Sequence, residues 1–92
     1  MMLRITREDT ERGKITLKLE GRLAQDLVGL LEQECSTLHA LSGAPTLDLS
    51  GVTFVDRSGV QALKRLRGMG CAIGGCSDLV ASVLKAEGIR VD

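Results

Sequence analysis

Residues 47–60 read LDLSGVTFVDRSGV, and this stretch decides the fold prediction. The alternation of apolar and polar residues just before and inside it predicts a strand over residues 46–49. Residues 51–55 are expected to form a loop or a short helical turn. A helix is predicted from about Ser58 to Arg67, because apolar residues recur there at helical spacing, at Val60, Leu63 and Leu66. A strand followed at once by a helix is the repeating unit of α/β folds.

The residues before this stretch predict two strands and a helix. Residues 15–20 alternate cleanly and form a half-buried strand that ends at Gly21, and residues 3–6 form a shorter strand that can pair with it as a hairpin. From Ala24 the period becomes helical, and Ser42-Gly43-Ala44-Pro45 stops the helix. Its apolar stripe consists of Ala24, Leu27, Val28, Leu31, Cys35 and Leu38.

The residues after it predict one more strand and one more helix. Residues 68–70 break the second helix, residues 71–73 form a short strand, and Gly74-Gly75 turns the chain. Ser77 caps a third helix that Gly88 ends, with a stripe of Leu79, Val80, Val83 and Leu84. The order β-β-α-β-α-β-α predicts an α/β fold in which helices pack on a small four-stranded mixed β-sheet.

Composition limits the classes of function. The chain has 92 residues, enough for a single domain over residues 1–92, with 12 basic and 12 acidic residues and only one aromatic residue, Phe54. A neutral chain without aromatic platforms is not expected to bind nucleic acid. No apolar run predicts a secretory signal or insertion into a membrane, so a cytoplasmic location is expected.

The spacing of the three cysteines does not match a known disulfide, zinc-binding or redox motif. Cys35, Cys71 and Cys76 are odd in number and lack the C-x-x-C spacing, and His39 is the only histidine. Buried, unreactive thiols are the expected state, and a zinc site or a redox role for Cys76 are the weaker alternatives. We expect no metal and no cofactor.

Ser58 is the strongest candidate for a functional residue in the sequence. It lies at a predicted helix start beside Asp56, Arg57 and Gly59. Free backbone N–H groups and the positive end of the helix dipole there can hold a phosphate on Ser58, with Arg57 as an added contact. Lys64 and Arg65 then strengthen the local positive field. The alternative is a plain helix cap, in which Asp56 or Ser58 accepts a backbone hydrogen bond.

The sequence resembles that of STAS domains (sulfate transporter and anti-sigma factor antagonist). The family pattern, roughly D-L-S-G-V-x-F-[IV]-D-[ST]-[SA]-G, is similar to residues 48–59. The resemblance continues at residues 19–23, which fit the family's L-x-G-x-L strand end, and at residues 71–77, which take the place of its last strand and turn. It implies a small mixed sheet with helices packed on it.

The resemblance also implies a function. In bacterial anti-sigma factor antagonists, the serine that matches Ser58 is phosphorylated by a partner that is both a serine kinase and an anti-sigma factor, and only the unphosphorylated form captures that partner. Asp56, Arg57 and Gly59 would then support the phosphorylation site. The sequence departs from the family at Arg57, where a small residue is usual, and at Ala24, where many antagonists carry Asp or Thr.

A second function is compatible with the same resemblance. Some STAS proteins are constitutive subunits of larger complexes, such as a bacterial phospholipid-trafficking ABC transporter with its ATPase, or a signalling assembly. Val60, Gln61 and Lys64 would then form the partner surface and Ser58 would only cap a helix. An enzyme is not expected, because the sequence has no paired carboxylates, no defensible Ser-His-Asp order and no phosphate-binding loop of P-loop spacing.

Overall fold

The computed structural model describes residues 3–9 and 13–91. The elements follow the predicted order β-β-α-β-α-β-α. They are β1 (Leu3–Asp9), β2 (Ile15–Leu23), α1 (Gln25–Ser42), β3 (Thr46–Val55), α2 (Arg57–Gly68), β4 (Ile73–Gly74) and α3 (Asp78–Ala86).

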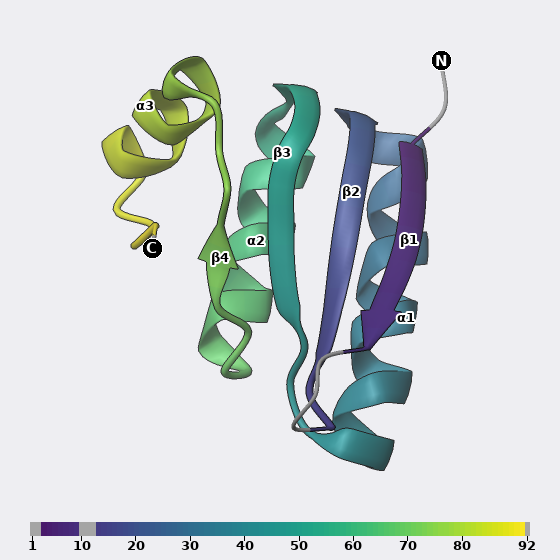
Figure 1. Ribbon diagram of the computed structural model, residues 1–92. Helices are drawn as coiled ribbons and strands as arrows, with labels where there is room; N and C mark the ends of the chain where they lie inside the picture. Colours follow the sequence, from purple (N-terminus) through teal and green to yellow (C-terminus); the bar gives the residue numbers. More distant parts are fainter. Residues whose placement is uncertain (1–2, 10–12, 92) are drawn as a thin grey trace.

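The four strands form one mixed sheet, as predicted. Their order in space is β1-β2-β3-β4, in which β1 runs antiparallel to β2 while β3 runs parallel to both of its neighbours. The carboxyl ends of β2 and β3 therefore lie together at one edge of the sheet, at the top of Figure 1, and the short strand β4 points toward the same edge from beside the first half of β3. Helices α1 and α2 lie behind the same face of the sheet, and α3 lies beyond β4 (Figure 1).

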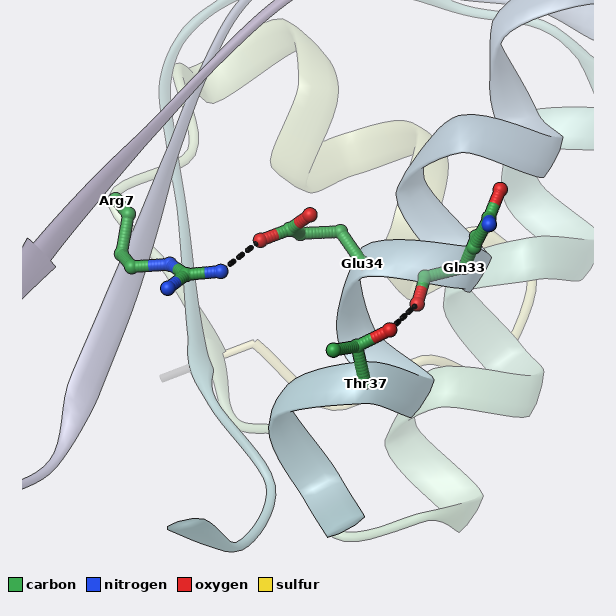
Figure 2. Close-up of polar contacts among 4 residues, drawn as sticks. All are labelled: Arg7, Gln33, Glu34 and Thr37. Atoms are coloured by element: carbon green, nitrogen blue, oxygen red, sulfur yellow. Dashed lines mark hydrogen bonds and ion pairs between the residues drawn. The ribbon is translucent and has the colours of Figure 1, made fainter. Parts of the chain in front are cut away.

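The core lies between the sheet and the two helices behind it. Alternate leucines of β2 and β3 point to this side and are fully buried, because side chains of a strand alternate between its faces. The helices supply the matching layer, and the fully buried leucines of both layers are Leu17, Leu19, Leu23, Leu31, Leu38, Leu47, Leu49, Leu63 and Leu66. At the rim, Arg7 of β1 donates to Glu34 of α1 at 2.5 Å, and the Thr37 hydroxyl donates to the Gln33 carbonyl at 3.1 Å (Figure 2).

The prediction of a loop or helical turn over residues 51–55 is wrong. These residues continue β3, and they pair with a longer β2 through Gly21 opposite Val52 and Leu23 opposite Val55. The register between the strands shifts at this point, and an added Cβ at Gly51 would lie only 3.0 Å from the Leu19 carbonyl oxygen. The β-branched and aromatic residues that follow Gly51 favour a strand once β2 offers a partner.

The third helix is placed correctly, but its apolar stripe is narrower than predicted. Val80 and Leu84 are buried, whereas Leu79 is 71% exposed and Val83 is 39% exposed. The reason is that α3 lies at the margin of the sheet, beyond β4 (Figure 1), and only Val80 and Leu84 among its residues are buried in the core. Two apolar side chains assigned to the core are therefore on the surface.

Candidate functional site

Asp56 joins the end of β3 to the start of α2. Its backbone is extended, with φ −89° and ψ −177°, and its Oδ1 accepts a hydrogen bond from the Gly59 N–H at 2.8 Å. Its own N–H donates to the Leu23 carbonyl at 3.1 Å. Asp56 is therefore the cap of α2, which decides between the two capping residues that the sequence left open and frees Ser58 from that role.

The same carboxylate also holds the start of α1. Its Oδ2 accepts a hydrogen bond from the Gln25 N–H at 3.0 Å. The residue before that helix, Ala24, has the extended backbone of a cap residue but no side chain that can accept. One carboxylate thus satisfies backbone donors at the starts of two helices, although Asp56 and Gln25 lie 31 residues apart in sequence.

Gly59 permits a close approach between α2 and the ends of β2 and β3. It is buried, and an added Cβ would lie 2.6 Å from the Leu23 carbonyl oxygen and 2.8 Å from a methyl group of Val55. Atoms do not approach that closely without a shift of backbone, so a side chain would push α2 away from the ends of both strands.

Ser58 is the second residue of α2 and is partly exposed. Its hydroxyl makes no hydrogen bond to any of the residues that the structure describes. Because Asp56 takes the capping role, a group on the Ser58 oxygen would meet the free amides of the first helical turn without displacing a bond of the hydroxyl.

The positive field around Ser58 is weaker than the sequence predicts. Lys64 pairs with Glu87 at 3.6 Å, and Arg65 donates two hydrogen bonds to Glu32, at 2.8 and 2.9 Å. The bonds from Arg65 hold the pKa of the Glu32 carboxyl below its usual value. Both cations are thus balanced by acids of other elements.

Arg57 is different. It is exposed, and no carboxylate among residues 3–9 and 13–91 pairs with it. It is therefore the cation beside Ser58 that remains open to an outside anion.

A groove runs along α2 next to this site. It has a volume of about 410 Å³ and is lined on the α2 side by Arg57, Val60, Gln61 and Lys64, which share one face at helical spacing. The residues predicted as a partner surface are thus together on one wall. Ser58 itself lies on the neighbouring flank and does not line the groove.

Helix α3 also contributes to this surface, which the sequence pattern did not indicate. Val83 and Glu87 form the opposite wall of the groove. The signal that could have found them is weak, because Val83 fits the apolar stripe of α3 as well as it fits a surface position.

The thiols show no sign of a metal site in the described part of the chain. All three cysteines are free; Cys35 and Cys71 are buried and Cys76 is partly buried. A hydrogen bond with Cys71 and burial raise the pKa of Cys35, and burial raises the pKa of Cys76, so the thiolate is disfavoured at these two residues; the same hydrogen bond lowers the pKa of Cys71. Among the described residues, no group of three or more His, Cys, Asp or Glu is placed to hold a metal ion.

Within residues 3–9 and 13–91, no helix is both long enough and apolar enough to cross a membrane.

Solved structures share this architecture. The anti-sigma factor antagonist SpoIIAA in its unphosphorylated form matches with a TM-score of 0.66 and 21% identity, over 89% of this chain and 82% of that one. This chain has the SpoIIAA-like fold. The phosphorylated form of the Bacillus cell fate determinant SpoIIAA gives a TM-score of 0.63 at 19% identity, over 94% of this chain and 85% of that one.

A third similar structure is a STAS domain. It is the STAS domain of an anti-sigma factor antagonist from Rhodobacter sphaeroides, with a TM-score of 0.57 and 22% identity over 77% of this chain and 82% of that one. The sequence matches no protein-family model and no curated protein. The STAS-like fold implied by the sequence pattern is therefore confirmed by the likeness of the structures.

Proposed function

We propose that this protein is a non-catalytic interaction switch of the anti-sigma factor antagonist type, in which phosphorylation of Ser58 controls binding to a partner protein. The observation that carries the proposal is that the Ser58 hydroxyl, at the start of a helix capped by Asp56, has no hydrogen-bond partner among the described residues. The SpoIIAA structures with the same fold include an unphosphorylated and a phosphorylated form. The partner would be a serine kinase that is also an anti-sigma factor, acting in the cytoplasm.

Each neighbouring residue has a part in this proposal. Asp56 and Gly59 fix the start of α2 against the ends of β2 and β3, so that Ser58 is presented from a rigid element. Arg57 is the cation next to the phosphate. Val60, Gln61 and Lys64 form the adjoining wall on which the partner docks.

Electrostatics explains how the phosphate would release the partner. A phosphoserine adds about 1.5 to 2 negative charges at neutral pH. At Ser58 this charge would lie close to the carboxylate of Asp56 and beside the proposed docking wall. Placing it within an interface costs desolvation and repels acidic groups of the partner. The protein would thus act by changing the amount of free partner, without catalysis and without a cofactor.

The test compares two substitutions at one position. Ser58→Asp is expected to weaken binding to the partner recovered from the native host about tenfold or more, and Ser58→Ala to leave binding within about twofold. Ser36→Asp, on an exposed position of α1, is the matched control for added charge. Equal binding by both Ser58 variants would leave the alternative, a constitutive subunit of a transporter or signalling complex.

A further inference from the structure

An apolar hollow lies between the carboxyl end of β3 and α3. It has a volume of about 220 Å³, and Thr53 is the only polar residue in its lining. Phe54, Leu79 and Val83 line it although they are 43%, 71% and 39% exposed. Clustered exposed apolar side chains mark interaction sites in soluble proteins. Pockets for small molecules are larger, about 300–1,000 Å³, so this hollow suits a side chain of another protein.

The hollow and the α2 groove are parts of one surface. Val55 and Val83 line both. The surface therefore runs without a break from Phe54, along α3, to Arg57 and Lys64. A partner that docks on the wall of α2 in the way proposed above reaches the hollow without bridging any intervening structure.

The charges at the margins of this surface select the kind of partner. The guanidinium of Arg22 lies 4.5 Å from the centre of the Phe54 ring, and Arg57 lines the groove. Neither arginine has a carboxylate partner among the described residues.

The two acids that line the groove are already engaged. Asp56 accepts two backbone hydrogen bonds, and Glu87 pairs with Lys64. Among the described residues, the charges left unpaired in the groove and against the Phe54 ring are therefore those of Arg57 and Arg22, and they are complementary to carboxylates.

We propose that the hollow between β3 and α3 receives an aliphatic side chain from an acidic segment of the partner protein, whose carboxylates pair with Arg22 and Arg57. The inference rests on the proposed function, since it extends the same docking surface. It gives Arg57, a departure from the family pattern, the role of a specificity residue. A phosphate on the neighbouring Ser58 would compete with the partner's carboxylate for this arginine.

The probe is a synthetic amphipathic peptide with leucines and glutamates at helical spacing. Its two matched versions carry alanine for each leucine, or lysine for each glutamate. We expect the first peptide to bind with a Kd of about 1 mM or tighter and to shift the amide NMR signals of Phe54, Leu79 and Val83. Equal binding by either matched version, or no shift of these signals at about 1 mM peptide, would overturn the inference.

Variants of this chain locate the contact. Leu79→Asn is expected to weaken peptide binding about tenfold, since a leucine loses its apolar contact, and Arg57→Gln about threefold. Leu41→Asn is the control for the first, because Leu41 is 75% exposed on α1. Arg4→Gln, on exposed β1, is the control for the second. An effect of the controls equal to that of the test variants would also overturn the inference.

The two proposals fail separately. If the peptide binds at the hollow of wild-type protein but Ser58→Asp changes neither peptide nor partner binding, the docking surface holds and the switch fails. If the peptide does not bind but Ser58→Asp still releases the host partner, the switch holds and the acidic, aliphatic segment is wrong.

Discussion

Helices α1 and α2 begin at the same edge of the sheet, but they are anchored differently. The start of α2 has its own cap in Asp56, whereas Ala24, at the start of α1, has no side chain that can accept a hydrogen bond. The Gln25 N–H is satisfied by the second oxygen of Asp56. The difference shows that one residue of the 47–60 stretch, Asp56, holds both helix starts, and that the Ser58 hydroxyl makes no hydrogen bond within residues 3–9 and 13–91.

The largest expected effect comes from removing this shared anchor. Asp56→Ala leaves backbone donors of both helices unsatisfied and should lower the free energy of unfolding by about 2–4 kcal/mol in urea denaturation. Asp78→Ala is the matched control, because Asp78 lies in the first turn of α3 but Ser77 is the cap there. A loss no greater than that of the control would mean that the two hydrogen bonds do not hold the helix starts.

The next largest effect is a change in stability of opposite sign when the glycine of each helix is replaced by alanine. Gly59→Ala should destabilise the protein by about 1–3 kcal/mol, because the added Cβ meets the Leu23 carbonyl. Gly29→Ala in α1 has open space around it and should stabilise the protein by about 0.5–1 kcal/mol, because alanine favours a helix. Thermal unfolding of the two variants checks the prediction, and shifts of the same sign would contradict it.

A smaller change can make the two helix starts alike. Ala24→Ser supplies α1 with a cap on a backbone that is already extended, at φ −135° and ψ 171°. We expect a gain of about 0.5–1 kcal/mol in the free energy of unfolding. If stability falls instead, the start of α1 does not have the geometry described.

The smallest expected effect on stability comes from the ion pair between Glu32 of α1 and Arg65 of α2, which lies far from the starts of these helices. Arg65 lowers the pKa of Glu32, so this pair stabilises the fold above the usual pKa of the carboxyl, 4.5, and loses that contribution as the pH falls through the lowered value. Glu32→Gln should therefore be less stable than wild type at neutral pH and should approach it in acid. Urea titrations at several pH values measure the difference, and a difference that is constant with pH would contradict the assignment.

Much of the fold was predictable because it depends on local patterns. Leucines that alternate over residues 15–20 and apolar residues at helical spacing after Ala24 define strands and helices without reference to the rest of the chain. The continuation of β3 through Val55 was not predictable in this way. It depends on pairing with Leu23 of β2, and pairing is not a property of residues 51–55 alone.

The sequence was enough to predict which residues form the site, but not the long-range hydrogen bonds and ion pairs that they make. The pattern placed Ser58, Asp56 and Gly59 at a helix start, where the structure has them. It did not indicate that Asp56 reaches Gln25, or that Arg65 is balanced by Glu32, because these contacts span 31 and 33 residues. The apolar hollow was missed for the same reason, since exposure of Leu79 depends on where α3 lies.

The most direct test of the proposed Ser58 switch is affinity capture of the protein from its native host, with the bound proteins and the state of Ser58 identified by mass spectrometry. We expect a serine kinase of the anti-sigma type bound to protein with an unmodified Ser58, and phosphate on Ser58 in the fraction without the partner. A transporter ATPase or a scaffold protein as partner, with Ser58 never phosphorylated, would contradict it.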